Sequence, residues 1–270
     1  MASKKEEKDT IKARTKAPKN KKDNRGKVLF LRIIFLIVLT TSSVIASQLL
    51  IGYLMIWILG SSTFEQPVWT AIYSALSYLV ALGFMVFVVP KILRKKEGEF
   101  LRIGRDEIGL KGLPTWTDLG LAPIGFFAYL LLSGVLVSIF SLFPWFDVSQ
   151  AQDVGFSVFI SGFDRALAFI TLVIVAPIAE EIIFRGWLYG KMRNEFLAKF
   201  SERSSMIASI ILVSLLFGAL HMQWNVGVNV FAMSIIMCIL REITGTIYSG
   251  IILHMIKNGV AFYLLYVLGT

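Results

Sequence analysis

The sequence predicts an all-α, polytopic integral membrane protein, a helical bundle of about seven transmembrane helices, with six to eight possible. Three observations lead to this fold class. Hydrophobic residues make up 56% of the 270-residue chain and charged residues only 17%, whereas roughly 25% of a soluble domain is charged. The mean hydropathy is +0.71. Apolar runs long enough to cross a bilayer recur along the chain, so one water-facing domain could not hide its apolar side chains.

A transmembrane helix needs about 20 predominantly apolar residues, and this rule predicts seven spans. The first is long enough to be tilted or to begin at the membrane interface, whereas the fifth and sixth are short. We therefore expect one helical bundle over residues 28–270, without a separate soluble domain. The predicted spans lie near residues 30–59, 68–91, 116–143, 165–186, 205–221, 226–240 and 246–268.

Most of the net charge belongs to the N-terminal tail, residues 1–27. The chain carries a formal charge of +9, and the tail alone holds eleven Lys and Arg residues against four acids. A segment this polar buries too little apolar surface to fold, which predicts a disordered cytoplasmic tail that sets topology or lies near anionic lipid. Because the basic residues do not form a folded face, we expect the lipid bilayer as a partner and no nucleic acid.

The loops between the spans alternate in charge. Lys and Arg are concentrated in 91–111 and 191–203 and are absent from 60–67, 144–163 and 222–225. Since Lys and Arg are enriched in cytoplasmic loops, this pattern predicts a cytoplasmic N-terminus and an external C-terminus.

Ionisable residues in the fourth span follow Pro177, which is expected to kink or break the helix. Glu181 and Arg185 are four residues apart, in the order that favours an ion pair. Glu180 points about 100° away around the helix, where a narrow cavity would suit it to general base catalysis. Alternatively, both acids only lock the bundle through salt bridges.

The two histidines of the chain, His221 and His254, both fall in predicted spans. His254 and Asn258 are four residues apart, so they share a helix face and could donate hydrogen bonds to a developing oxyanion. The alternative for this pair is an ordinary interhelical polar contact, and for His221 a packed, hydrogen-bonded side chain. Lys257 lies deep in the last span and requires a carboxylate or carbonyl partner.

Together, these residues resemble the three ordered motifs of the CPBP intramembrane proteases, also called the Abi or CAAX-processing family, which includes prenyl-protein endopeptidases. The motifs are Glu180-Glu181-x-x-x-Arg185, Phe217-x-x-x-His221 and His254-x-x-x-Asn258. The resemblance covers a catalytic core at about residues 165–265, and neither the first three spans nor the tail carries a motif.

The resemblance implies an intramembrane endopeptidase that acts on membrane-associated or CAAX-like peptides. It implies that Glu180, helped by His221, activates water, that His254 and Asn258 stabilise the oxyanion, and that Glu181 and Arg185 organise the site, with Phe217 as a further motif residue. In a bacterial plasma membrane, the expected localisation, it implies peptide maturation or bacteriocin immunity. A catalytically inactive scaffold of the same fold and an ion-coupled transporter remain alternatives.

No cofactor is favoured, although zinc is possible. Glu180, His221 and His254 would be the ligands if a metal were bound. The Glu-Glu-x-x-x-Arg pattern differs from the His-Glu-x-x-His helix of zinc proteases, and Arg185 would oppose a nearby cation. Cys238, the single cysteine, lacks the spaced partners of a thiolate site. A glutamate protease without bound metal is therefore the favoured interpretation.

The depth of the site is difficult to place from these spans. Glu180 and His254 fall within a few turns of the predicted cytoplasmic ends of their helices. At about 1.5 Å per residue, His221 lies some 25 Å from the cytoplasmic end of the fifth span. A hairpin within the membrane near Met222, or steep tilting, would be needed to bring His221 to the other residues.

Overall fold

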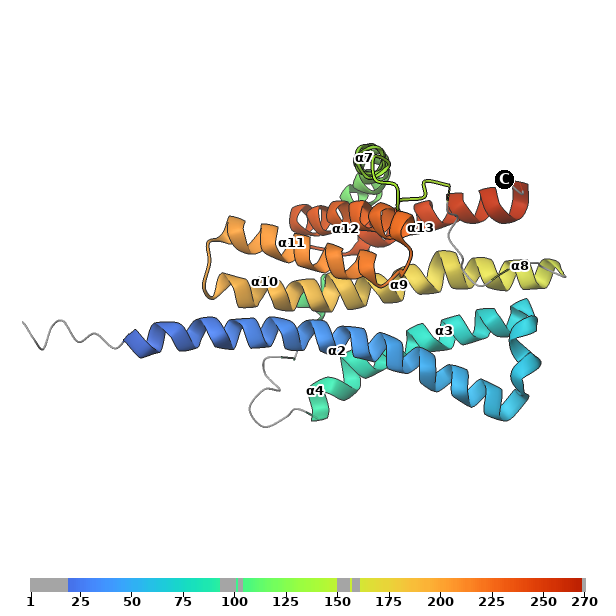
Figure 1. Cartoon of the computed structure of the whole chain (residues 1–270), viewed down its shortest axis with the longest axis horizontal. Coiled ribbons are helices and arrows are strands. Elements are labelled where there is room, and N and C mark those ends of the chain that lie inside the picture. The colour runs from blue at the N-terminus through green and yellow to red at the C-terminus, as the bar shows by residue number, and fades with distance from the viewer. Residues whose placement is uncertain (1–18, 93–100, 102–103, 150–155, 157–160, 269–270) are drawn as a thin grey trace, which may run out of the picture.

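The computed structural model describes residues 19–92, 101, 104–149, 156 and 161–268, and in these ranges every regular element is helical (Figure 1). The elements in chain order are α2 (Lys19–Leu59), η1 (Ser61–Glu65), α3 (Pro67–Gly83), η2 (Phe84–Val88), α4 (Val89–Ile92), α6 (Arg105–Ile108), α7 (Trp116–Phe140), α8 (Gly162–Phe169), η3 (Ile170–Val175), α9 (Ala176–Glu180), η4 (Glu181–Leu188), α10 (Tyr189–Leu197), α11 (Glu202–Ala219), α12 (Trp224–Thr244), α13 (Tyr248–Tyr263) and η5 (Leu264–Leu268).

Seven helical stretches within the described residues are long and apolar enough to cross a membrane, which confirms the predicted all-α, polytopic bundle. Large apolar side chains such as Leu49 and Trp57 are exposed on the outside, as expected for side chains that face lipid. The seven stretches are Gly26–Leu59, Pro67–Ile92, Trp116–Phe140, Gly162–Leu197, Glu202–Ala219, Trp224–Thr244 and Tyr248–Leu268.

The fourth stretch is the central helix of the bundle and is much longer than predicted. It runs for 36 residues through α8, η3, α9, η4 and α10, which lie along one line in Figure 1. It begins at a capping box, in which Ser161 and Asp164 bond each other's backbone N–H groups. Pro177 does not interrupt it, because α9 continues into π-helical η4 and follows π-helical η3. Such π-helical turns often occur at functional sites.

Two basic segments, the N-terminal tail and the 191–203 connection, contain more helix than the sequence predicted. Helix α2 already begins at Lys19, so part of the predicted tail continues the first helix, while residues 1–18 lie outside the described ranges. Lys191 and Arg193, predicted to lie in a loop, are buried in α10. Arg193 bonds Glu242 of α12 through its Nε at 3.2 Å. The connection to α11 is therefore short, and the ion pair of Arg193 joins α10 to α12.

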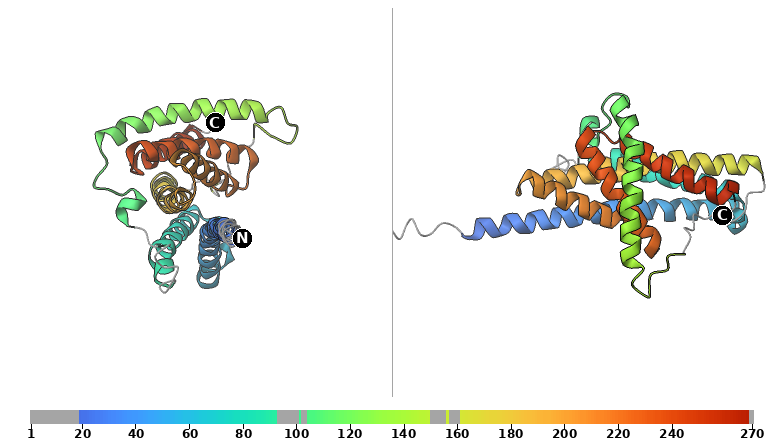
Figure 2. Two further views of the ribbon diagram at one scale, coloured as in Figure 1. Left: turned by 90° about the vertical axis from the view of Figure 1, so that its left-hand side faces the viewer. Right: turned by 90° about the horizontal axis from the view of Figure 1, so that it is seen from above.

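Helix α7 crosses over α12 and α13, as the view from above in Figure 2 shows. Asp118, in its first turn, is almost fully buried and accepts hydrogen bonds from Thr246 Oγ1 at 2.6 Å and Ser249 Oγ at 3.0 Å. This carboxylate holds the start of α13, the helix that carries His254.

Helices α11 and α12 form a hairpin whose backbones touch at two glycines. A Cβ added to Gly218 would lie 2.7 Å from the carbonyl oxygen of Gly227, which is too close for any side chain. Small residues allow membrane helices to approach in this way. The contact lies one turn before His221 and so sets the position of that histidine.

We expect Gly218→Ala to lower the free energy of unfolding by about 1–3 kcal/mol, because overpacking would force α11 and α12 apart. Thermal unfolding in detergent measures the change. Gly134→Ala in α7 is the matched control, since its Cβ would meet nothing within 4 Å. Equal effects of the two substitutions would contradict the close approach of the glycines.

Candidate active site

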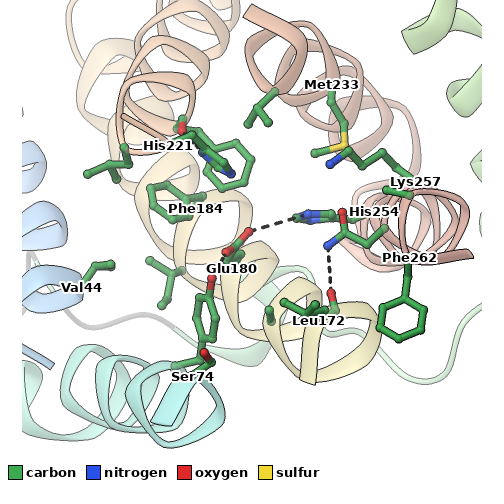
Figure 3. A pocket seen from close by; sticks show the side chains of 18 of the residues that line it. Val44, Ser74, Leu172, Glu180, Phe184, His221, Met233, His254, Lys257 and Phe262 are labelled. Atoms are coloured by element: carbon green, nitrogen blue, oxygen red, sulfur yellow. Dashed lines mark hydrogen bonds and ion pairs between the residues drawn. The ribbon is translucent and has the colours of Figure 1, made fainter. Parts of the chain in front are cut away.

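A cavity of about 350 Å³ lies among the central helix, α11, α12 and α13 on one side and α2 and α3 on the other (Figure 3). Polar groups converge in it on a largely apolar wall, a composition typical of small-molecule and peptide sites. The polar lining residues are Gln48, Ser74, Tyr78, Glu180, His221, His254, Lys257, Asn258 and Tyr266, and the apolar ones are Val44, Leu172, Ala176, Ile183, Phe184, Phe217, Leu220, Val230, Met233, Ala261, Phe262 and Leu265.

The long central helix removes the difficulty over depth. Glu180 lies seventeen residues before the end of this helix at Leu197, and His221 lies nineteen residues after the start of α11 at Glu202. The two helices are antiparallel neighbours, so both residues lie roughly 26–29 Å from their common turn at 1.5 Å per residue. The prediction that Glu180 lies near a helix end was wrong, because the helix continues far beyond residue 186.

Glu180 points into the cavity, and its side chain is 12% exposed. Its Oε1 accepts a hydrogen bond of 2.6 Å from the Tyr78 hydroxyl of α3. Its Oε2 lies 3.8 Å from Nε2 of His254 (Figure 3). The two carboxylate oxygens therefore have different neighbours, and Oε2 faces the histidine.

Glu181 faces away from the cavity and forms the predicted ion pair with Arg185, at 2.8 Å and with both side chains buried. The same oxygen, Glu181 Oε1, lies 3.1 Å from Nδ1 of His254. Because an ionised carboxylate only accepts hydrogen bonds, Nδ1 is the donor in this contact. The pair thus orients the His254 ring so that Nε2 is turned toward Glu180.

Phe217 lies between the two histidine rings, with centroids 5.2 Å from His221 and 6.1 Å from His254. The Arg185 guanidinium carbon lies 4.1 Å from the centroid of the same ring. A cation over an aromatic face is stabilised by the ring quadrupole. Phe217 thus connects the buried ion pair with the polar wall of the cavity.

His221 lies in the turn between α11 and α12, and its Nδ1 is 2.9 Å from the carbonyl oxygen of Phe217. A carbonyl cannot donate, so Nδ1 carries the hydrogen and Nε2 keeps its lone pair in the neutral ring. Burial lowers the pKa of His221 below its usual value, although the charge of Glu180 opposes this shift. A neutral ring can accept a hydrogen bond from water at neutral pH.

Asn258 lies one turn after His254 on α13, and both residues line the cavity. Its Nδ2 donates a hydrogen bond of 2.9 Å to the carbonyl of Leu172 in π-helical η3. An amide nitrogen carries two hydrogens, so this bond fixes the side chain and leaves a second donor.

The structure places in one cavity all four residues expected to be catalytic, Glu180, His221, His254 and Asn258. Sequence reasoning missed the contributions of α2 and α3, above all Tyr78. A tyrosine in an apolar span belongs to no motif, and only the packing of α3 against the central helix reveals its contact. Lys257, singled out for its depth in the last predicted span, also lines the cavity.

The side chains of the described residues do not form a metal site of the usual kind. Among the residues that the structure describes, no group of three His, Cys, Asp or Glu side chains could hold a metal ion, and this includes Glu180, His221 and His254.

Residues 162–260 match a family model described as type II CAAX prenyl endopeptidase Rce1-like. This match confirms the resemblance predicted over about 165–265 and contains all three motifs. No curated protein and no solved structure matches the chain significantly.

Proposed function

Because residues 162–260 match the Rce1-like endopeptidase family, which implies protease activity, we propose that this chain hydrolyses peptide bonds within the membrane by a glutamate-activated water. The observation that carries this proposal is the position of Glu180. It lies in the cavity between Tyr78 and His254, while the adjacent Glu181 is committed to Arg185. The Glu180 carboxylate is therefore available as a base, whereas the Glu181 carboxylate has a structural role.

In the proposed reaction, a water molecule near Glu180 and His221 gives a proton to Glu180 Oε2 while its oxygen attacks the carbonyl carbon of the scissile bond. Nε2 of the neutral His221 accepts a hydrogen bond from the same water and orients it. The tetrahedral intermediate then collapses, the carbon–nitrogen bond breaks, and Glu180 returns the proton to the leaving amine. The net result is the addition of one water across the peptide bond.

The proposed oxyanion donors are His254 Nε2 and the second amide hydrogen of Asn258. Because Nδ1 of His254 already donates to Glu181, this role requires a proton on both ring nitrogens. Donors held in advance where charge develops lower the barrier without reorganisation, and removing one typically costs about 10²–10³-fold in rate. Glu181 and Leu172 hold these two side chains in place.

The proposed substrate is a membrane-associated peptide that ends in a CAAX-like sequence. The wall formed by Phe184, Met233, Phe262 and Leu265 suits aliphatic side chains. In a bacterial plasma membrane, with the N-terminus in the cytoplasm, the same reaction would mature peptide signals or provide bacteriocin immunity.

The test is cleavage in reconstituted vesicles. We expect the purified chain to cut a lipid-anchored peptide with a C-terminal Cys-aliphatic-aliphatic-X sequence, and to cut a peptide with these four residues scrambled far more slowly. Because no group of described residues is arranged to hold a metal, cleavage should persist at roughly the full rate after treatment with a strong chelator. Mass spectrometry of the products measures both arms.

Loss of cleavage on chelation, restored by zinc, would overturn the glutamate mechanism. Binding of the peptide without any product would instead support an inactive scaffold. Peptide-linked proton flux without hydrolysis would support a transporter.

A further inference from the structure

The site extends beyond the segment that carries the motifs, because α3 contributes a hydrogen bond to the proposed base. The Tyr78 hydroxyl donates to Glu180 Oε1 at 2.6 Å, a short distance typical of a hydroxyl bonded to a carboxylate. Tyr78 lies outside residues 162–260, the range matched by the family model. The bond therefore joins the N-terminal part of the bundle directly to the site.

Packing of α3 on the central helix holds Tyr78 in this position. Ala71, fully buried, accepts a hydrogen bond of 3.5 Å at its carbonyl from Thr171 Oγ1 of η3. One face of α3 carries Ala71, Ser74 and Tyr78, because Ser74 follows Ala71 by three residues and Tyr78 follows it by seven. Ser74 and Tyr78 line the cavity from this face. The contact at Ala71 thus aligns the helix two turns before the tyrosine.

We propose that Tyr78 is a positioning residue for Glu180, an inference that rests on the proposed function. By occupying Oε1, its hydroxyl fixes the carboxylate plane and leaves Oε2, 3.8 Å from His254 Nε2, as the oxygen that receives the proton of water. Accurate placement of a reacting group accounts for much of enzymatic rate enhancement.

The chemistry of a phenol suits this role. Glu180 is the only carboxylate among the described residues that line the cavity, and it shares the cavity with His221, His254 and Lys257. A cationic side chain in place of Tyr78 would add to the positive charge that the proposed mechanism already assigns to His254, and would weaken the Glu180 carboxylate as a base. A neutral hydroxyl donates one hydrogen bond and leaves the negative charge in place.

The test is Tyr78→Phe, which keeps the ring and removes only the hydroxyl. A hydrogen bond to a charged group is strong enough that we expect kcat to fall about 10- to 100-fold. KM should stay within about twofold and the melting temperature within about 3 °C, because neither substrate contacts nor packing changes. The matched control is Tyr73→Phe on the same helix, where the ring packs edge-on against Phe64 instead of lining the cavity. It should leave kcat unchanged.

The inference is overturned if Tyr78→Phe keeps the wild-type kcat, whether or not KM rises. It is also overturned if a large loss of melting temperature accompanies the loss of rate. Glu180→Gln separates this result from the parent proposal. If that variant is inactive and Tyr78→Phe behaves as wild type, only the role of Tyr78 fails. If Glu180→Gln is fully active, the proposed function itself fails.

Discussion

Replacing Glu180 by Gln is expected to abolish peptide cleavage while the bundle stays folded. The amide has nearly the same shape and still accepts a hydrogen bond from Tyr78, but it cannot take a proton from water. A positioned general base typically accelerates a reaction by about 10²–10⁴-fold, so the cleavage rate should fall by at least about 10²-fold. Cleavage of the lipid-anchored peptide in vesicles measures the rate, and thermal unfolding in detergent measures the fold.

Glu202→Gln provides the control for this experiment. Its side chain is 87% exposed at the start of α11 and makes only a 3.7 Å contact with Arg193. The Glu202→Gln substitution removes the same negative charge far from the cavity. The cleavage rate and the thermal stability should therefore equal those of the wild type within error. An undiminished rate in Glu180→Gln would show that the assigned base is wrong.

Replacing Arg185 by Met should cause the largest loss of stability among single substitutions of the site. It would leave the Glu181 carboxylate, at 0% exposure, without its arginine partner and with only the contact to His254, and would also remove the cation over Phe217. Breaking one side of a buried ion pair costs about 3–5 kcal/mol. Activity should fall as well, because Glu181 orients His254. Equilibrium unfolding in mixed micelles measures the free energy.

A second substitution tests the physical cause. Glu181→Gln combined with Arg185→Met removes the buried charge that has lost its arginine and keeps an oxygen for His254 Nδ1, so it should recover part of the lost stability. Arg32→Met is the control, since Arg32 is 47% exposed where it pairs with Glu195 at 3.0 Å, and its loss should cost less than about 1 kcal/mol. If Arg185→Met is as mild as Arg32→Met, the central pair does not organise the site.

Local helix geometry explains which parts of the site were predictable. Glu181 with Arg185 and His254 with Asn258 are four residues apart, and this spacing alone places each pair on one helix face. Sequence reasoning therefore predicted the ion pair, which the structure contains. It also predicted that Glu180 points in a different direction, and Glu180 does line the cavity. Spacing could not reveal how far each helix extends, so the depth of Glu180 was misjudged.

The sequence by itself determined the membrane-spanning helical class, the seven spans found among the described residues and the resemblance of residues 162–260 to the Rce1-like family, because composition and short-range spacing carry that information. Only the tertiary structure decided that the central helix continues to Leu197, which brings Glu180 and His221 to one level. It also decided that Tyr78 meets Glu180. Both outcomes depend on how helices distant in the chain pack on one another, and the local periodicity of a single sequence does not record that packing.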